Sequence, residues 1–480
     1  MTFVTDPTVK TSDETLLTQS VSYNDTVKLP YLYDIEKRKG AVIGFYLDAE
    51  LTEKWNPETP VTQDLTIYPA WGEYYDSAYF NAPKMYLNTE GEAPIVSKET
   101  YLPCTVEITD AGAHSIEAKT AGVRGRGNTT WFQLSDKKAY RVKFDKKINL
   151  FGMGKEKDYL LIANAMDYTL MRNDLVCYTA RALGLEYTTE TEWIHLFLNG
   201  EYNGLYLLCE QTETGKYRVD IGKDDEEGNE LKSGEEMGFL LEMDMAADHG
   251  GDRYFKFKRI RTTEGFRSWR EKMICRVVSP DGDYITDEQF DYIKEYMTEV
   301  NFAFATRDFQ KLSSIVDIDS LIDFYIVNQV SFSLDMGWAF YMYKPAGEKL
   351  HFGPVWDFDK SFGNMNDGGE EYDSFKAGEE NLWFTWITES SQFKKAVAKR
   401  WNEVYSDIIL KIDNRVYELY NKYIYDVKAN FIRWDTIGDE YWRSPKSIEK
   451  LKTYNGQVRY LLDWLEDRVV WMNETISAWQ

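Results

Sequence analysis

Two aspartates flank a segment that the sequence predicts to be one β-hairpin. Residues Trp338–Lys344 and Lys349–Trp356 are rich in aromatic and β-branched side chains, and Pro345–Glu348 between them has the composition of a turn. With the turn in this segment, Asp335 comes within one diagonal step of Asp357 across the ladder. Facing residues in such a ladder have Cβ atoms about 4.5–5.5 Å apart. We therefore expect these two carboxylates to converge at the open end of the hairpin.

Converging carboxylates repel each other unless a positive charge lies between them. The usual solutions are a hard divalent cation with oxygen ligands, or a proton shared in acid–base chemistry. The alternative is that both aspartates are solvated residues of strand ends and turns, where Asp is common. The sequence after the hairpin favours a functional role, because Asp357 and Asp359 lie among the bulky apolar residues of Trp356–Gly363. An unpaired charge in such surroundings is costly.

The charge and composition of the chain exclude several classes of protein. Its 480 residues carry 56 Lys and Arg against 80 Asp and Glu, a formal net charge of −24. A nucleic-acid-binding surface, which needs clustered basic residues, is therefore not expected. We also expect no membrane span and no intact signal peptide, because long apolar runs are missing. The 4 Cys and 4 His are scattered without the spacing of a zinc site, so we expect isolated buried thiols.

The first part of the chain is predicted to be a polar linker over residues 1–21, followed by a small β-rich domain over residues 22–72. Short β-like runs occur at Thr26–Leu32, Ala41–Leu47 and Thr66–Trp71. The segment Gly44–Trp71 resembles the repeat of secreted bacterial proteins known as the Listeria–Bacteroides or internalin B-repeat. The matching positions are Gly44–Tyr46, Asp48–Glu50, Pro60–Thr62 and Leu65–Trp71. This resemblance implies an extracellular or cell-surface location and a spacer without catalytic residues.

A loop that contains glycine and arginine lies between two predicted strands of the next domain. The loop Arg124–Thr130 has the sequence RGRGNTT. Its glycines permit close approach to a ligand, while its arginines, asparagine and threonines supply donors for anionic oxygens. In the following strand Ala139–Phe144, Arg141 and Lys143 share the face opposite the apolar residues. We predict a strand–loop–strand lid over a polyanion. A simple glycine turn before an amphipathic edge strand is the alternative.

Further strands and then helices are predicted along the chain. The strands are 158–164, 193–198, 205–210 and 238–243. Among them we expect a helix with Asp167 as its N-cap and Gly184 just after its end. Arg172 and Asn173 fall in its first turns, and solvated surface is the simplest interpretation of both. Helices dominate from Asp287 onward, apart from the hairpin.

Five motifs in order resemble those of the CotH family, the spore-coat-protein-H type of atypical kinase. The motifs are Arg124–Thr130, Lys138–Phe144, Asp167–Asn173, Asn199–Glu210 and Gly353–Gly363, and the resemblance runs from about Lys84 to Gln480. It implies an α+β, atypical protein-kinase-like domain over residues 82–480. A mixed or antiparallel sheet would form the N-lobe at about 82–245, and helices would form the C-lobe at about 285–480.

The resemblance also implies a transferase that moves the γ-phosphoryl group of ATP to Ser or Thr of an extracytoplasmic protein, with Mg²⁺ or Mn²⁺. Asp335 would be the catalytic base or would orient the hydroxyl group. Asp357 would bind the metal ion, with Asp359 as a second metal ligand. The residues implied to bind the nucleotide are Arg124, Gly125, Gly127, Asn128, Lys138, Arg141 and Lys143, with Glu210 as the partner of the lysine by analogy with kinases.

One departure from the kinase pattern leaves alternatives open. Kinases place an Asn a few residues after the catalytic Asp to hold a second metal ion, and this chain has Ala339 in that region. A catalytically weak or inactive kinase-like module for surface adhesion or structure is therefore the alternative function. A glycoside hydrolase with two carboxylates is a third hypothesis, suggested by the acidic charge and the 15 Trp. It gives the basic loop no role.

Overall fold

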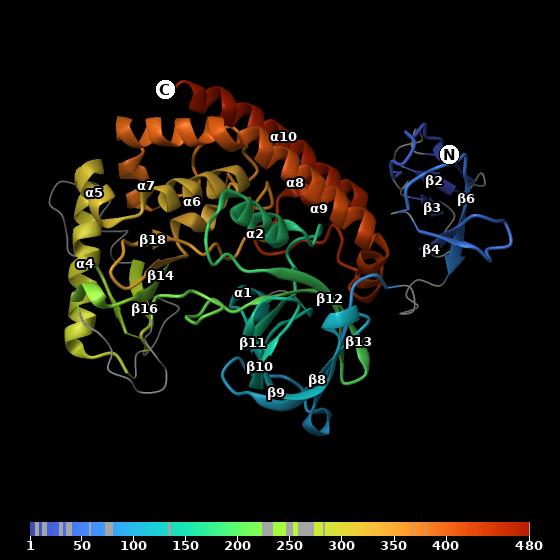
Figure 1. Cartoon of the computed structure of the whole chain (residues 1–480), viewed down its shortest axis with the longest axis horizontal. Coiled ribbons are helices and arrows are strands. Elements are labelled where there is room, and N and C mark those ends of the chain that lie inside the picture. The colour runs from blue at the N-terminus through green and yellow to red at the C-terminus, as the bar shows by residue number, and fades with distance from the viewer. Residues whose placement is uncertain are drawn as a thin grey trace. The chain divides into compact units, whose positions relative to one another are not determined.

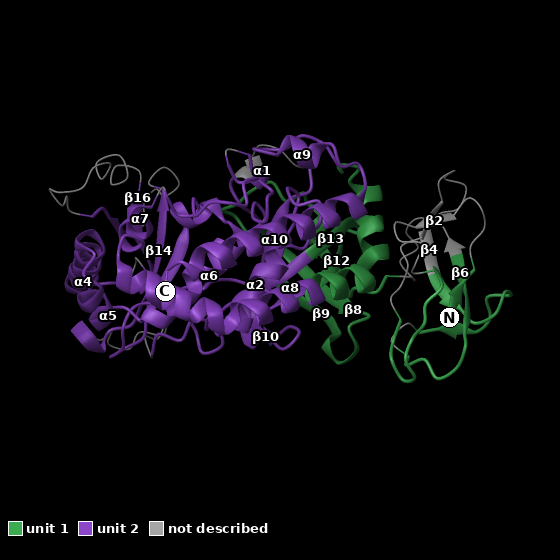
Figure 2. Ribbon diagram, turned by 90° about the horizontal axis from the view of Figure 1, so that it is seen from above, with its two compact units in different colours: residues 1–124, 193–206, 415–437 green, residues 125–192, 207–414, 438–480 purple. Residues whose placement is uncertain are grey.

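The computed structural model describes residues 1–4, 9–11, 17–27, 32–34, 41–56, 59–72, 80–132, 136–222, 234–245, 253–257, 273–281, 284–366, 368–379 and 381–479. The chain forms two compact units, coloured separately in Figure 2. Unit 1 comprises residues 1–124, 193–206 and 415–437, and unit 2 comprises residues 125–192, 207–414 and 438–480. Among the described residues, no helix has the length and apolar character needed to cross a membrane.

The N-terminal part of unit 1 is a small β structure. Its strands are β1 (Thr2–Phe3), β2 (Val9–Thr11), β3 (Leu32–Asp34), β4 (Ala41–Tyr46), β5 (Lys54–Trp55) and β6 (Thr66–Gly72). Strands β1, β6, β4 and β5 form one sheet, and its core contains Phe3, Phe45, Trp55 and Ile67. Strands β4 and β6 confirm two of the predicted runs. The remaining predicted run is Thr26–Leu32. Thr26 is not in a strand, residues 28–31 lie outside the described part, and Leu32 begins β3. The expected linker contains β1 and β2.

Seven strands close into a barrel in the order β10-β11-β13-β12-β7-β8-β9. They are β7 (Lys84–Thr89), β8 (Leu102–Thr109), β9 (Ile116–Arg126), β10 (Ala139–Asn149), β11 (Lys155–Ile162), β12 (Thr191–Leu198) and β13 (Glu201–Glu210), several of them labelled in Figure 1. Strands β7 and β12 pair in parallel and β10 and β11 antiparallel. The sheet is therefore mixed, as expected, but it is closed, which leaves no exposed strand edge.

A second sheet lies within unit 2 and contains the predicted hairpin. Its strand order is β15-β16-β14-β17-β18. The strands are β14 (Phe239–Met245), β15 (Tyr254–Phe255), β16 (Met273–Ser279), β17 (Phe340–Lys344) and β18 (His351–Phe352). The turn is confirmed, because Glu348 N–H donates to the Pro345 carbonyl at 3.1 Å. Tyr343 faces His351 in the ladder. Strand β18 is shorter than predicted and ends before Pro354, whose nitrogen has no proton to donate.

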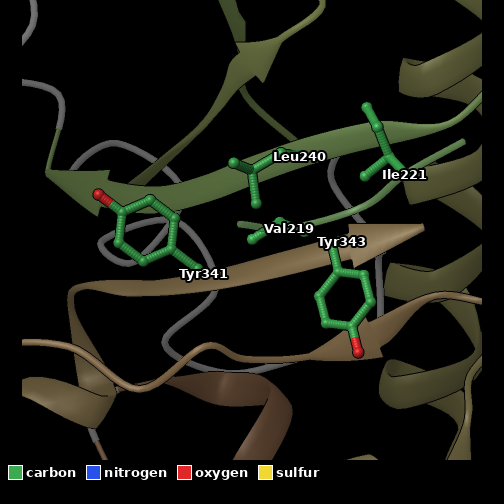
Figure 3. Packing of buried hydrophobic residues seen from close by; sticks show 5 residues of the cluster. All are labelled: Val219, Ile221, Leu240, Tyr341 and Tyr343. Carbon is green, nitrogen blue, oxygen red and sulfur yellow. The ribbon is translucent and has the colours of Figure 1, made fainter. Parts of the chain in front are cut away.

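Aromatic packing supports this sheet on one face. Figure 3 shows the buried cluster, formed by Val219, Ile221, Leu240, Tyr341 and Tyr343. Tyr341 and Tyr343 are two residues apart on β17, so both point to the same face of the sheet. The cluster thus holds the hairpin against the segment that follows the barrel.

Helices dominate the second half of the chain, which confirms the expected α+β class. The first half contains α1 (Thr129–Phe132) and α2 (Arg172–Leu183). The second half contains α4 (Asp287–Thr306), α5 (Phe309–Ile315), α6 (Ile318–Ser331), α7 (Leu382–Ile387), α8 (Ser391–Arg433), α9 (Lys446–Glu449) and α10 (Tyr454–Ser477). Asp317 caps α6 by accepting the Ser320 N–H at 2.8 Å. Gly184 ends α2 in the left-handed conformation, as predicted. The two-lobed kinase arrangement stays a prediction.

A buried polar network joins three elements of unit 1. The carboxylate of Asp426 on α8 accepts the backbone N–H groups of Asn81 and Ala82, each at 2.8 Å. The same oxygen lies 2.8 Å from Nε2 of His195 on β12, and both side chains are 0 % exposed. Nδ1 of His195 in turn contacts the hydroxyl group of Tyr202 at 2.9 Å. One carboxylate therefore ties the entry to β7, strand β12 and helix α8 together.

Replacing this carboxylate should destabilise unit 1. We expect Asp426→Ala to lower the free energy of unfolding by about 3–5 kcal/mol, because the change leaves buried donors without an acceptor. Chemical denaturation of the wild type and the variant measures the difference. The matched change of exposed Asp435, Asp435→Ala, should cost less than about 0.5 kcal/mol. Equal losses in the two variants would contradict the structural role of the network.

Candidate functional site

Helix α6 and a short 3₁₀ turn position Asp335. The helix ends at Ser331 and is capped by Phe332, which has a φ of 52°. The 3₁₀ turn Leu334–Gly337 follows. The backbone carbonyl of Asp335 accepts the N–H groups of Trp338 and Ala339, both at 2.8 Å. These hydrogen bonds fix the backbone of the turn. They use the backbone carbonyl of Asp335 and not its half-buried side-chain carboxylate. The turn thus presents Asp335 at the base of β17.

Asp357 and Asp359 lie in the segment after β18. Between them is Phe358, whose backbone N–H is bound by Asn173 of α2. The N–H of Phe358 donates to Oδ1 of Asn173 at 2.8 Å. Asn173 is oriented by its own bond to Asn164 at 2.9 Å. Asp357 has a φ of 65° and an exposed side chain, whereas Asp359 is 8 % exposed. Asn173 therefore sets the backbone between the two aspartates.

A buried ion pair holds the same segment from the other side. Arg172 and Asp167 form a salt bridge with both side chains 0 % exposed. Arg172 Nε donates to the Ser361 carbonyl at 2.8 Å, and Nη2 donates to the Phe362 carbonyl at 3.3 Å. The expectation that Arg172 lies on solvated surface is therefore wrong. The N-cap position is Met171 and not the predicted Asp167. Asp167 nevertheless accepts the N–H of Arg172 at 2.9 Å, which satisfies one backbone donor at the start of α2.

Asn364 completes this support. Its Nδ2 donates to the Met166 carbonyl at 2.7 Å and to the Asp359 carbonyl, and its Oδ1 accepts the hydroxyl group of Tyr441. Asn364 is 0 % exposed, so the bonds are shielded from water. The motifs around residues 167 and 357, which are distant in sequence, are thus joined by side chains of both.

Like charges and burial raise the pKa values of the three aspartates. Burial raises the pKa of Asp335 to about 7, with a further increase from Asp357 and opposing effects from Lys360 and Arg443. Burial raises the pKa of Asp359 to about 8, again with Asp357 adding to the effect. Asp357 is exposed, yet protein packed around it reduces its hydration and raises its pKa. The three carboxyl groups thus lie within electrostatic reach of one another. The ladder of β17 and β18 ends at Phe352, so Asp335 and Asp357 do not face each other across it as predicted.

A buried lysine provides part of the counter-charge. Burial lowers the pKa of Lys360 to about 8, whereas Asp359 raises it. Its Nζ donates to the Trp442 carbonyl at 2.7 Å and lies 4.0 Å from the ring centre of Tyr441. Lys360 therefore anchors the segment 441–442 beside the aspartates, and sequence analysis did not identify these residues.

Arg126 is the loop arginine that lies at the aspartates. Its guanidinium group is 4.9 Å from the ring centre of Trp356, and its charge lowers the pKa of Asp357. Arg124, which was expected to bind phosphate, belongs to unit 1, where it donates to the Lys98 carbonyl and lies 5.1 Å from the ring centre of Tyr101. Two residues apart on a strand, the arginines share one face, so the sequence pattern alone did not distinguish them.

The glycines of the loop serve its internal packing. A Cβ atom at Gly125 would clash with the ring of Trp131, and one at Gly127, which has a φ of 90°, would clash with Thr130. Asn128 accepts the Trp131 N–H at 3.2 Å through its carbonyl group. Trp131 can therefore pack directly on the backbone of β9. A ligand is not needed to explain these glycines.

Lysines next to the loop are bound to backbone carbonyl groups. Lys138, a predicted phosphate ligand, donates to the Trp131 carbonyl at 2.8 Å. Its neighbour Lys137 is 3 % exposed and donates to the Ala163 carbonyl at 2.7 Å. Burial lowers the pKa of Lys137 well below its ordinary value. The sequence pattern did not distinguish Lys137 from the adjacent Lys138.

The predicted basic face of β10 exists, and an acidic residue of β11 pairs with it. Arg141 lies 2.6 Å from Asp158, and Lys143 lies 3.6 Å from the same carboxylate. Asp158 faces Lys143 across the ladder. The expectation that both side chains point unpaired at a loop ligand is thus incomplete. Glu210 pairs with Arg218 at 2.6 Å rather than with one of the predicted lysines.

A cavity of about 220 Å³ lies beside these groups in unit 2. Its walls include Thr189, Glu210, Glu213, Arg218 and Pro354. Burial raises the pKa of Glu213 to about 8, with a further increase from Asp158. Electrostatic interactions connect Glu213 to Arg141, then to Arg126 and Asp357. We call Glu213, Arg141, Arg126 and Asp357, which are linked by these pairwise electrostatic interactions, the polar path.

The donor set suits a magnesium ion that also binds phosphate. Among the described residues, no group of three or more His, Cys, Asp and Glu could hold a metal ion alone. Mg²⁺ in phosphoryl-transfer sites usually takes one or two carboxylates and completes its shell with phosphate oxygens and water. Asp357 and Asp359 supply that number of hard oxygen ligands.

Comparison with known proteins identifies one matching family. A family model described as CotH kinase protein matches residues 123–472. The matched range includes Asp335, Asp357 and Asp359 as well as the ion pair that supports them. No curated protein matches the chain.

Loss of the buried guanidinium group should destabilise the site and unit 2. We expect Arg172→Met to lower the free energy of unfolding by about 3–5 kcal/mol, because the buried Asp167 carboxylate loses its partner. Chemical denaturation gives the value. The double change Asp167→Asn with Arg172→Met should recover part of the loss, because no buried charge remains unpaired. If the single variant were as stable as the wild type, the proposed support would be wrong.

The raised pKa of Asp335 predicts a pH-dependent stability. The folded protein holds this proton up to about pH 7, whereas the unfolded chain releases it near pH 4. The folded state binds more protons in this window, so its stability falls as the pH rises. Relative to Asp335→Asn, the melting temperature of the wild type in EDTA should therefore decrease from pH 4 to pH 7. Exposed Asp467 supplies the control Asp467→Asn, which should follow the wild type. Parallel curves for wild type and Asp335→Asn would disprove the shift.

Proposed function

Because the chain belongs to the CotH family of kinase proteins, we propose that it transfers the γ-phosphoryl group of ATP to a serine or threonine hydroxyl group of a protein. The observation that carries this proposal is the polar path from the cavity at Glu213 through Arg141 and Arg126 to the crowded aspartates. A nucleoside triphosphate has a neutral base, an anionic phosphate chain and a metal-bound terminal phosphate. These three parts correspond in order to the cavity, the arginines and the aspartates.

The cavity end of the path suits the base. Its volume of about 220 Å³ is below the roughly 300–1,000 Å³ of pockets that enclose drug-sized ligands, so it fits one ring system. Thr189, Glu210 and Gln211 supply polar groups to its walls. Arg126 then offers a guanidinium group for phosphate oxygens, which arginine binds with two parallel hydrogen bonds. Arg141 adds positive charge nearby while it stays paired with Asp158.

The aspartate end of the path suits the reacting groups. Asp357 and Asp359 would hold Mg²⁺ or Mn²⁺, which when bound neutralises the charge of the transferred phosphoryl group. Asp335 would orient the acceptor hydroxyl group and take its proton as the oxygen bonds to phosphorus and ADP leaves. A general base works best with a pKa near the working pH, and the pKa of about 7 for Asp335 meets this condition.

The rigid support of the site agrees with this chemistry. Phosphoryl transfer depends mainly on positioning and electrostatic stabilisation. Asn173 and Arg172 hold the backbone on either side of Asp359 through bonds of 2.8 Å each. The protein thus fixes the aspartates before a nucleotide arrives, and little reorganisation is needed during the reaction.

We also propose that the protein acts outside the cell, on an extracytoplasmic substrate. The resemblance of Gly44–Trp71 to a repeat of secreted bacterial proteins supports this location. The alternative is a weak or inactive kinase-like surface module, and Ala339 supports it. The N–H of Ala339 donates to the Asp335 carbonyl, but its methyl side chain offers no oxygen to a second metal ion.

Nucleotide binding and transfer separate the two functions. Calorimetry should show binding of ATP with Mg²⁺, weakened roughly tenfold or more by Asp357→Ala, because the carboxylate that joins metal to protein is lost. Arg126→Ala should weaken binding more than the matched variant Arg124→Ala. Asp335→Ala should still bind ATP but lose transfer of radiolabelled phosphate to protein.

The outcomes distinguish the candidates directly. Binding without transfer by the wild type would favour the inactive module. No heat with either Mg²⁺ or Mn²⁺ would remove the nucleotide from the proposal. Equal effects of the two arginine variants would contradict the assignment of Arg126 to the phosphates.

A further inference from the structure

A second cavity lies in unit 2, with a volume of about 240 Å³. Its walls are largely aromatic, with Tyr325, Phe375, Phe384 and Trp479 among the lining residues. The ring of Phe375 lies 4.8 Å from that of Trp479, a separation typical of interacting aromatic rings. None of these residues belongs to the path from Glu213 to Asp357. The cavity is therefore a separate feature of the fold.

One polar group in this cavity has no partner in the described part of the chain. Tyr325 on α6 is 1 % exposed, and its hydroxyl group makes no hydrogen bond to a described residue. Buried hydroxyl groups in native proteins are nearly always hydrogen-bonded. Tyr325 thus places an unused donor and acceptor beside aromatic walls. A ligand with a flat apolar body and a polar tip would satisfy both features.

The cavity is next to the turn that carries Asp335. Gly378 lines the cavity and has a φ of 82°. A Cβ atom on Gly378 would lie 3.2 Å from the sulfur of Met336, the residue that follows Asp335. The side chain of Gln329 on α6 holds the adjacent Ala377 carbonyl at 2.8 Å. Gly378 therefore borders the cavity and also lies against the side chain of Met336.

We propose that this cavity receives an aromatic side chain of the protein substrate, from a residue near the serine or threonine that is phosphorylated. The inference rests on the proposed kinase function and adds a sequence preference to it. The volume admits one aromatic side chain, the walls offer rings to pack against, and Tyr325 can pair with the hydroxyl group of a tyrosine. The position next to Met336 would keep the acceptor hydroxyl group close to Asp335.

Charge at the cavity also suits a peptide. Lys394 at the start of α8 lies 5.5 Å from the ring centre of Trp479, and exposed Glu379 lines the same cavity. Opposite charges at one cavity can accept the polar groups of a peptide backbone, whereas a purely apolar ligand would leave both unused. These groups favour a protein segment over a free hydrocarbon-like molecule.

Fluorescent peptides test the proposal without requiring turnover. Each peptide carries one serine in a Gly-Ala background, with a single Tyr, Phe or Ala placed at successive positions on either side. Fluorescence anisotropy with the full chain should show, at one position, binding roughly tenfold tighter for Tyr or Phe than for Ala. Transfer of phosphate to the same peptides should follow this preference. Equal binding of all peptides would overturn the proposal.

A filled cavity and a matched surface change give the controls. Thr388 lines the cavity and its hydroxyl group donates to the Phe384 carbonyl at 2.9 Å. Thr388→Trp should abolish the aromatic preference by occupying the space. Thr306 makes the same kind of bond to Phe302 at 2.8 Å but does not line the cavity. Thr306→Trp should keep the preference, and its loss there would overturn the assignment to the cavity.

A conservative change tests the unpaired hydroxyl group. Tyr325→Phe removes an oxygen that has no partner among described residues, so the melting temperature should stay unchanged. The Tyr peptide should then bind no better than the Phe peptide, and a persistent advantage of Tyr would contradict the role of Tyr325.

Other outcomes separate this inference from the proposed function. An aromatic preference in a protein that binds no ATP would overturn the kinase function and leave the cavity as a peptide site. ATP binding without an aromatic preference would overturn the cavity assignment alone. Dimers of the wild type that Thr388→Trp dissociates would show that a second copy of the chain fills the cavity, which would also overturn the substrate assignment.

Discussion

The buried pair of Asp167 and Arg172 is the interaction on which the site depends. Both side chains are inaccessible to water. The guanidinium group also donates hydrogen bonds to the carbonyl groups of Ser361 and Phe362. Two charges in the interior are costly to desolvate and are tolerated only when their hydrogen bonds are complete. The start of α2 therefore has one position relative to the segment that carries Asp357 and Asp359.

Hydrogen bonds hold the backbone around the site, but the negative charges of its aspartates are only partly neutralised by nearby positive groups. Asp335 and Asp359 have pKa values raised by burial and by Asp357, and Lys360 offsets them only in part. Crowded carboxyl groups oppose folding, and the hydrogen bonds of Asn173 and Asn364 hold them together. Perturbed pKa values of this kind are common at functional sites. The arrangement favours a ligand that brings positive charge, such as a metal-bound nucleotide.

Much of the framework followed from local patterns in the sequence. The turn at Pro345–Glu348 and the glycine after α2 each depend on a few neighbouring residues, and both were predicted. The hairpin was also predicted, but its ladder ends before the aspartates, so their interaction does not come from facing strand positions. The extent of β18 did not, since Pro354 ended the ladder before the predicted boundary. The closed barrel was missed because strand order depends on pairings between distant segments.

The sequence by itself determined the order of the motifs, the family to which they belong, and the set of acidic and basic residues from which a phosphoryl-transfer site can be built. Only the tertiary structure decided which of these residues meet. It placed Arg126 rather than Arg124 at Asp357, paired Arg141 and Lys143 with Asp158, and buried Arg172. The physical reason is that the charge state and role of an ionisable side chain depend on burial and on partners distant in sequence, which no local pattern records.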